Sequence, residues 1–241
     1  MVNQEAGQPE AAEDAYRKSL AIKVRLGNVA GQASTFNQLG ILYDDDLGRT
    51  EEAVAFSRQA ADKYVECRDP AKEGVARNNL AMRLCKLLRL YEARQEIRRA
   101  IECKAQSGHA SQPWTSWSIL ANIETDAGNR AAAAEAQGKA IVNYLAYRRD
   151  GGENHDAPGR ISLAVTQSLL AGKPAEAASL LQQLAADPDA EWLLPFIRAL
   201  QSIVAGSRDR TLADAPDLEY TMAAEILFLI ETLEQPRQPP A

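Results

Sequence analysis

An internal repeat with a period of about forty residues dominates the sequence. The stretch from Asn79 to Ile101 recurs on either side with its small and apolar residues in register. Leu80 is followed by Leu120 after 40 residues and is preceded by Leu39 at a distance of 41. Such a period predicts an array of similar units, each packed against its neighbours, rather than a domain with one central core.

Each unit is expected to form two helices. In the first, Leu80, Leu84 and Leu87 are spaced by three and four residues, which places them on one helical face. A second helix carries Ala93 and Ile97 at a similar spacing. Paired helices approach closely only where side chains are short, and two anchor positions hold small residues in the copies. These residues are Gly40, Ala81 and Ala121 at one position, and Ala12, Ala53, Ala93 and Ala133 at the other.

The order of these anchors resembles the tetratricopeptide repeat. Two copies carry the pattern best: Phe36, Leu39, Gly40, Tyr43, Gly48, Ala53 and Ala60 in one, and Trp117, Leu120, Ala121, Gly128, Ala133 and Ala140 in another. The period of about 40 exceeds the family's usual 34 residues and is similar to the long-period arrays of kinesin light chains and of bacterial signalling proteins. The resemblance covers residues 5 to 150 well. It implies an all-α fold, a right-handed superhelical α-solenoid of about eleven helices in antiparallel pairs, without a β-sheet.

The repeat pattern also divides the chain. Residues 1–150 are predicted to form a regular array of a half repeat and three full repeats, followed by a glycine-containing loop at 151–159. Residues 160–234 are predicted to form divergent repeats that end in a capping helix. A disordered tail is expected at 235–241.

The first predicted helix, from Pro9 to Leu26, corresponds to the second helix of a repeat and has no preceding partner helix. We therefore expect the chain to be a piece of a larger protein. The face that carries Tyr16 and Leu20 should be partly exposed, and an apolar stripe of this kind favours self-association.

The composition argues against several kinds of partner. The formal charge is −6 and the pI is about 5.1, whereas nucleic-acid binding generally requires a basic surface. The acidic excess lies in residues 151–241, which carry 6 basic and 13 acidic side chains. No apolar run approaches the length of a membrane span, so no membrane partner is expected. Three cysteines without a close pair are expected to be reduced thiols, which predicts a cytoplasmic protein.

We find no constellation of catalytic residues in the sequence, and we expect neither enzyme activity nor a cofactor nor a metal site. Asp44, Asp45 and Asp46 are consecutive, so their side chains point in different directions, and they are expected to be solvated. His155 lies near Glu153, but one flexible loop supplies too few fixed metal ligands.

The third repeat is rich in basic residues, most of which are expected to form a solvated face. Arg77 and Arg83 differ, because they take positions that apolar residues hold in the other copies. A buried unpaired charge is costly. Either this repeat is more loosely packed, or these two arginines have acidic partners.

The resemblance implies a ligand groove on the concave side, lined by the first helix of each repeat. Counting from the Leu-Gly and Leu-Ala anchors, the groove residues are Ser34, Asn37, Ile41 and Asp45, then Asn78, Met82, Cys85 and Lys86, and then Thr115, Ser118, Asn122 and Asp126. Asn37, Asn78 and Ser118 are equivalent positions and would form a polar ladder. An asparagine amide can hold a peptide backbone, because it offers both a donor and an acceptor. The alternative is that these asparagines form hydrogen bonds between neighbouring helices.

The expected function is a protein-interaction scaffold or sensor module, part of a larger signalling protein, that binds a peptide or a partner domain in this groove. Because Lys86 and the basic third repeat lie beside Asn78, the ligand is expected to be an extended segment with some acidic character. The alternative is an accessory array that controls an effector domain in cis without a ligand of its own. Binding of a separate ligand would distinguish the two.

Overall fold

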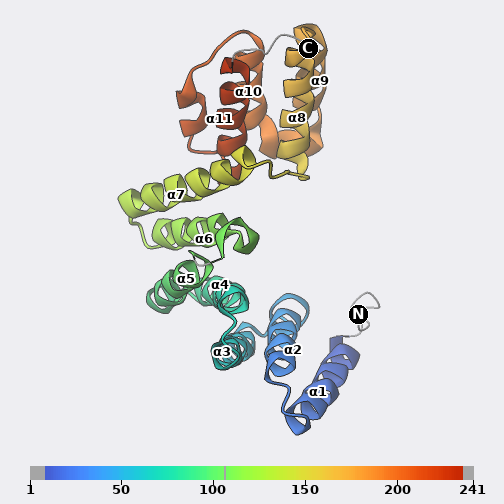
Figure 1. Ribbon diagram of the computed structural model, residues 1–241, viewed down its shortest axis with the longest axis vertical. Helices are drawn as coiled ribbons and strands as arrows, with labels where there is room; N and C mark the ends of the chain where they lie inside the picture. Colours follow the sequence, from blue (N-terminus) through green and yellow to red (C-terminus); the bar gives the residue numbers. More distant parts are fainter. Residues whose placement is uncertain (1–8, 106, 236–241) are drawn as a thin grey trace. The chain divides into compact units, whose positions relative to one another are not determined.

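The computed structural model describes residues 9–105 and 107–235, and every regular element in these ranges is a helix (Figure 1). The α-helices are α1 (Pro9–Arg25), α2 (Val29–Ile41), α3 (Thr50–Glu66), α4 (Pro70–Lys86), α5 (Leu90–Ala105), α6 (Pro113–Asp126), α7 (Arg130–Arg149), α8 (Ala157–Leu170), α9 (Pro174–Ala185), α10 (Leu194–Val204) and α11 (Tyr220–Glu234). Shorter helical turns are η2 (Leu42–Asp46), η3 (Gly108–Ser111), η4 (Pro188–Leu193) and η5 (Arg210–Asp214). The predicted all-helical array without a β-sheet is confirmed for these ranges. Within them, no helix has the length and apolar character that a membrane span requires.

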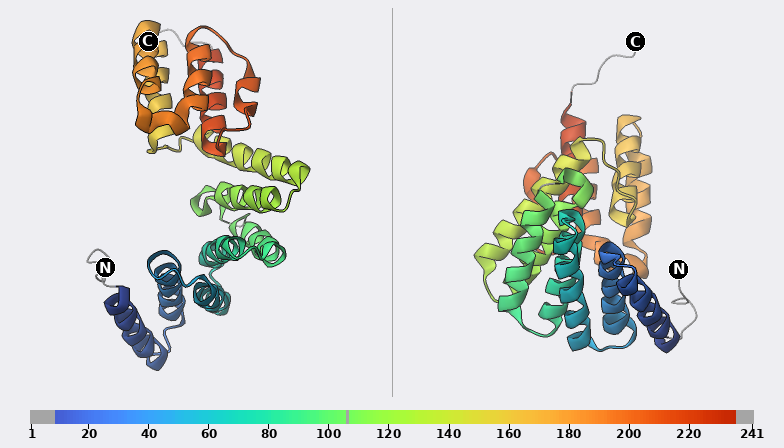
Figure 2. Two further views of the ribbon diagram at one scale, coloured as in Figure 1. Left: turned by 180° about the vertical axis from the view of Figure 1, so that it is seen from behind. Right: turned by 60° about the horizontal axis from the view of Figure 1, so that its bottom comes forward.

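The chain divides into two compact units, Met1–Gln137 and Gly138–Ala241. The division falls within α7, earlier than the predicted end of the regular array at residue 150. In the first unit, the helices from α1 to α6 follow one another and each packs against the next (Figure 2). This order of contacts is that of a helical repeat protein, in which each repeat packs against its neighbouring repeats.

Small residues set the distance between helices in the first unit. Gly40 is buried, and a Cβ atom there would lie 3.0 Å from Ser57 Oγ and 3.4 Å from the carbonyl oxygen of Ala53. Ala53 and Ala93 are fully buried at the other anchor position, whereas Ala133 is only half-buried. The predicted role of the short side chains therefore holds in the second and third repeats and weakens in the fourth.

The extra residue of the second repeat forms a π-helical turn. Leu39 lies 41 residues before Leu80, although the next copy follows after 40. The end of α2 continues into η2, which is π-helical, and a π turn is how a helix accommodates an inserted residue. Within this turn the side chain of Asp44 is only 6% exposed. The prediction of a solvated acidic run is therefore wrong for Asp44, because a neighbouring helix covers it.

Helix α1 packs against the array by the face that was expected to be partly exposed. Tyr16 and Leu20 are half-buried and contact the cluster around Leu39 and Tyr43. The exposed apolar side chains lie instead at the end of the helix and just beyond it: Ile22, Val24 and Leu26. Self-association through this helix stays a prediction.

The second unit consists of α8 to α11 and the C-terminal part of α7. The loop predicted at 151–159 is shorter, since α8 begins at Ala157. The Asp156 side chain caps this helix by accepting a hydrogen bond of 3.0 Å from the Gly159 amide. Pro158 lies in the first turn, where proline is tolerated because its missing N–H has no partner in the helix. The predicted tail lies outside the described residues from 236 onward.

A buried ion pair lies in the second unit, next to a core of mostly apolar side chains. Glu225 of α11 is fully buried, and one carboxylate oxygen lies 3.3 Å from an Arg148 nitrogen. The hydroxyl of Tyr144 and the amide of Asn154 donate to the same oxygen, each at 3.3 Å. Burial raises the pKa of Glu225, and the Arg148 charge opposes that shift. The pair fixes the C-terminal turns of α7 against α11.

The turn between α4 and α5 lacks the glycine that the neighbouring repeats use. Gly48 and Gly128 have φ values of +64° and +74°, whereas the equivalent residue in the third repeat is Leu88 with a φ of +57°. The Leu88 side chain is 80% exposed and gains little from packing. A left-handed conformation costs a non-glycine residue about 1–2 kcal/mol.

We therefore expect Leu88→Gly to raise the free energy of unfolding by about 0.5–1 kcal/mol. Glycine removes the strain of the left-handed conformation, but part of this gain is offset because glycine loses more conformational entropy on folding. Urea denaturation measures this. The reciprocal substitution Gly128→Leu should destabilise the chain. If both substitutions leave the denaturation midpoint unchanged, these turns carry no strain.

Candidate functional site

The first helices of successive repeats, α2, α4 and α6, present one shared surface, which we call the first-helix face. It consists of Ser34, Asn37, Ile41 and Asp45 from α2 and η2, of Val75, Asn79, Met82 and Lys86 from α4, and of Thr115, Ser118, Asn122 and Asp126 from α6. The α4 residues recur at intervals of four, three and four, so they form one stripe along that helix. Val75 and Met82 are exposed apolar side chains within this stripe.

Polar side chains join α2 to α4. The Asn79 amide nitrogen donates a hydrogen bond of 3.0 Å to Asn37 Oδ1. At the far end of the stripe, Lys86 Nζ lies 2.8 Å from Asp44 Oδ2 and 3.9 Å from Asp45 Oδ1. These contacts hold the two stripes in a fixed register.

A second set of hydrogen bonds joins α4 to α6. Asn78 is buried, and its Oδ1 accepts a bond of 2.8 Å from the Ser116 hydroxyl. Its Nδ2 donates to Thr115 Oγ1 at 3.4 Å. The alternative of hydrogen bonding between neighbouring helices therefore describes Asn78, whose amide is occupied on both sides, and also Asn37, whose Oδ1 accepts from Asn79 of α4.

The predicted groove residues thus separate into two groups. Asn78 and Thr115 serve the contact between α4 and α6. The others are exposed or half-buried, and all of them except Cys85 belong to the first-helix face: Ser34, Asn37, Ile41, Asp45, Met82, Cys85, Lys86, Ser118, Asn122 and Asp126. Sequence counting missed Asn79, which is the actual partner of Asn37. The sequence does show two adjacent asparagines, at 78 and 79, as candidates for this partner. Only the packing of the helices shows which of the two faces α2.

The two arginines at packing positions have acidic partners. Arg83 is buried, with Nη1 donating a bond of 2.7 Å to Ser57 Oγ and Nε at 3.6 Å from Asp44. Burial lowers the pKa of Arg83, and the Asp44 charge opposes this shift. Gly40 leaves room for the Arg83 guanidinium, since a Cβ atom at residue 40 would lie 3.6 Å from the guanidinium carbon.

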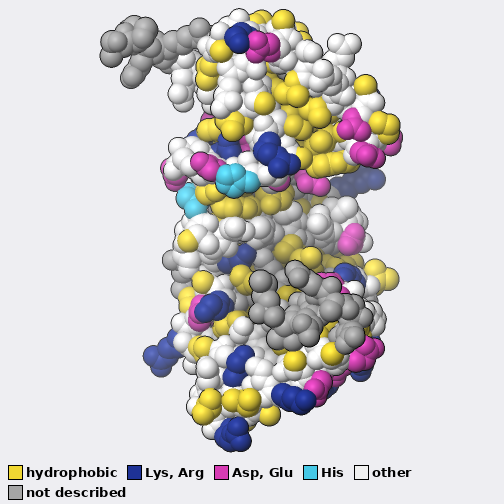
Figure 3. All heavy atoms as spheres, turned by 90° about the vertical axis from the view of Figure 1, so that its right-hand side faces the viewer, with side chains coloured by type: hydrophobic (Ala, Val, Ile, Leu, Met, Phe, Trp, Pro, Cys, Tyr) yellow, Lys and Arg dark blue, Asp and Glu magenta, His cyan; other side chains and the backbone are white. Residues whose placement is uncertain are grey.

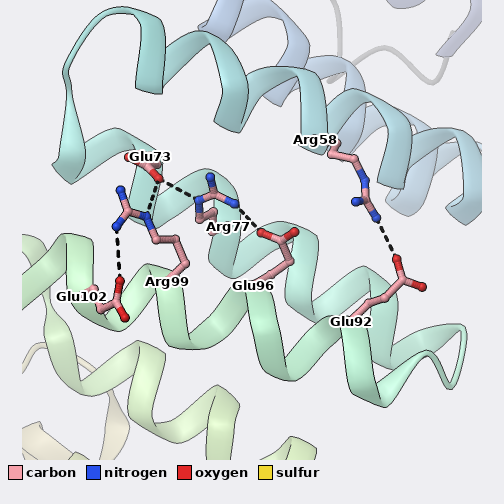
Figure 4. A network of polar contacts seen from close by, with 7 residues as sticks. All are labelled: Arg58, Glu73, Arg77, Glu92, Glu96, Arg99 and Glu102. Carbon is pink, nitrogen blue, oxygen red and sulfur yellow. Dashed lines mark hydrogen bonds and ion pairs between the residues drawn. The ribbon is translucent and has the colours of Figure 1, made fainter.

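Arg77 belongs to an ion-pair network on the side of α4 that is opposite to Val75, Asn79 and Met82 (Figure 4). Its Nε lies 2.8 Å from Glu73, and a second nitrogen pairs with Glu96 of α5. Arg99 reaches the same Glu73 oxygen at 3.1 Å and continues to Glu102. Burial acts to raise the pKa of Glu73, but the bonds from the two arginines lower it below its usual range.

The basic residues of the third repeat are therefore largely paired rather than available to a ligand. Arg89 pairs with Glu51 and Glu92, and Arg94 forms a two-bond pair with Glu124 at 2.6 and 2.8 Å. On the side of the molecule drawn in Figure 3, basic and acidic side chains of the described residues are interspersed. Of the basic residues between Arg77 and Lys104, only Arg83 and Lys104 are buried, and the others stay exposed or half-buried although most of them pair with carboxylates of α3, α4, α5, η2 and α6.

Lys104 is a buried amine at the end of α5, and it is 3% exposed. Its Nζ donates to Thr115 Oγ1 at 2.8 Å and to the Gln112 carbonyl oxygen at 3.5 Å. Burial lowers the pKa of Lys104 to about 8. Since Thr115 also accepts from Asn78, the lysine belongs to the network that joins α4, α5 and α6.

The described residues contain no group of three metal-ligating side chains. His155 and Glu153 approach to 3.1 Å but are both exposed, and Asp156 is used as the cap of α8. Asp44 is occupied by Lys86 and by the Thr50 hydroxyl, which donates a bond of 3.0 Å. Cys67 and Cys85 are half-buried free thiols, and Cys103 is a buried one.

Residues 1–64 match the family model of the tetratricopeptide repeat. This match supports a tetratricopeptide-repeat array at the start of the chain, where α1, α2 and η2 lie together with most of α3. Repeats of this family generally mediate protein–protein interaction, and their all-helical fold is typically a non-catalytic scaffold. No curated protein matches the chain.

We expect Asn78→Ala to lower the free energy of unfolding by about 1–3 kcal/mol, because the buried Ser116 hydroxyl would lose its acceptor. Chemical denaturation measures the loss. The matched control is Asn122→Ala, an exposed asparagine of α6, which should stay within about 0.5 kcal/mol of the parent chain. Equal effects of the two substitutions would contradict the structural role of Asn78.

Lys104→Met should stabilise the chain at neutral pH by about 1–3 kcal/mol, since a charged buried amine is replaced by an apolar side chain of similar length. The pKa of Lys104 is lowered to about 8 in the folded chain, below its ordinary value. The unfolded chain therefore binds more protons between these two pKa values, and the parent chain gains stability as pH rises through that window.

The advantage of Lys104→Met should consequently shrink from about pH 8 to pH 10. Urea titrations at several pH values measure it, and the exposed Lys18→Met is the control. If the stability gained by Lys104→Met does not change with pH, the charge of Lys104 does not destabilise the folded chain.

Proposed function

We propose that the chain is a protein-interaction module that binds an extended peptide, or an extended segment of a partner domain, on the first-helix face. The observation that carries the proposal is the α4 stripe, in which exposed Val75 and Met82 alternate with Asn79 and Lys86. Apolar side chains next to fixed polar groups supply both affinity and orientation for a peptide. The flanking stripes of α2 and α6 extend this surface across three repeats.

The asparagine pair supports the binding of a peptide backbone. The bond from Asn79 to Asn37 uses one donor and one acceptor. The Asn37 amide nitrogen and the Asn79 carbonyl oxygen have no partner among the described residues. One donor and one acceptor therefore remain on two amides that are bonded to each other, and they could serve the C=O and N–H of an extended peptide. We therefore propose that Asn37 and Asn79 hold the peptide backbone, in place of the predicted set of Asn37, Asn78 and Ser118.

Several finer expectations belong to the same proposal. We infer a right-handed superhelical arrangement of the kinesin-light-chain type, with the first-helix face on its concave side. We also infer a sensor or regulatory role in a bacterial signalling protein of the cytoplasm. The 40-residue period and the three free thiols support these inferences.

Met82→Glu tests the proposal. Random linear peptides displayed on phage are selected against the full chain, and a selected peptide is labelled and titrated by fluorescence anisotropy. The substitution should weaken binding about ten-fold or more, because it removes an apolar contact and places a charge under the peptide. Val65→Glu is the matched control, since Val65 is 47% exposed on α3 and Met82 is 49% exposed on α4.

Failure to select any peptide would overturn the proposal and favour an array that controls a neighbouring domain in cis. Equal weakening by Met82→Glu and Val65→Glu would place the binding elsewhere.

A further inference from the structure

We propose that the peptide held on the first-helix face is cationic, with lysine or arginine residues on both sides of an apolar residue that packs on Met82. This inference rests on the function proposed above and adds the chemistry of the partner. It replaces the expectation of an acidic ligand, which depended on Lys86 being free.

Carboxylates outnumber cations at the end of the face. Asp45 is 61% exposed, and Asp126 is exposed as well. Together with the buried Asp44 side chain they make three carboxylates, and the cations next to Asp44 are Arg83 and Lys86. One negative charge therefore remains in excess.

Lys86 is 52% exposed but is already paired with a carboxylate of the chain. Its ammonium group lies 2.8 Å from the buried Asp44 and leans towards Asp45 at 3.9 Å. Releasing it to an acidic ligand would leave the Asp44 carboxylate without this partner in a buried position. A cationic ligand requires no such exchange, since Asp45 is mostly open to solvent.

Asp126 extends the negative end of the face beyond α4. Burial is the main cause that raises the pKa of the Cys85 thiol to about 11, and the charge of Asp126 adds to it. Asp126 follows Lys86 by 40 residues, so it takes on α6 the position that Lys86 takes on α4. The order of charges across α2, α4 and α6 is negative, positive and negative. Asp45, Lys86 and Asp126 are all exposed, but Lys86 already has Asp44 as a partner.

The centre of the face is apolar. Met82 lies one helical turn before Lys86, and Ile41 of α2 is half-buried at the equivalent level. A methionine side chain is flexible and polarizable, so it adapts to several apolar partners. An apolar residue between two cations on the ligand would meet Met82 while its neighbours reach Asp45 and Asp126.

The experiment uses the same phage-displayed random peptides, selected against the full chain at low ionic strength. The selected sequences should be enriched in lysine and arginine around an apolar residue. The double variant Asp45→Asn, Asp126→Asn should bind a selected synthetic peptide about 3–10-fold more weakly, and the difference should shrink in high salt, because exposed ion pairs contribute modestly and are screened. Asp62→Lys, a charge reversal on the exposed side of α3, is the control and should leave binding unchanged.

Two outcomes would overturn the inference, and they are distinguishable. Selected peptides that are acidic or uncharged, yet lose affinity with Met82→Glu, would contradict the cationic partner and leave the binding face intact. An absence of selected peptides, or binding that is insensitive to Met82→Glu, would overturn the proposed function and this inference together.

Discussion

Close approach between neighbouring helices at short side chains is the constraint on which the first unit depends. Gly40 and Ala53 meet in the second repeat, and Ala81 and Ala93 are fully buried in the third. Since the helices are close at these points, a large polar side chain fits between them only where a small residue leaves room and a hydrogen-bond or ion-pair partner is within reach. Gly40 shows this, because it leaves room for the Arg83 guanidinium beside Ser57.

The third repeat is held by charge where its neighbours are held by apolar packing. Leu42 and Ile123 are fully buried at the positions equivalent to Arg83. Placing an arginine there requires an acceptor within reach, and the π-helical turn brings Asp44 to that place. The inserted residue and the buried arginine are therefore parts of one arrangement. Buried pairs of this kind are weak evidence for added stability, but removing one partner leaves an uncompensated charge.

The same pairing defines the surface that remains for a ligand. Asp44 pairs with Lys86, which stays 52% exposed, and Glu73, Glu96 and Glu124 pair with arginines of the third repeat. A repeat that is basic in sequence therefore presents little free positive charge. The groups left open on the first-helix face are the exposed apolar side chains of α4, one edge of the Asn37–Asn79 pair and the exposed aspartates.

The sequence by itself determined the helical repeat, its period and its small anchors, because these follow from local spacing that is independent of the partner helix. It also indicated that Arg77 and Arg83 were unusual, since a charge at a packing position is costly in any fold. Only the tertiary structure decided which carboxylates pair with them, that the extra residue becomes a π turn, and that Asn79 rather than Asn78 faces Asn37. Adjacent residues on a helix point about 100° apart, so a polar side chain joins one neighbour or the other according to small rotations of packed helices. Those rotations are set by contacts between repeats, which no single stretch of sequence contains.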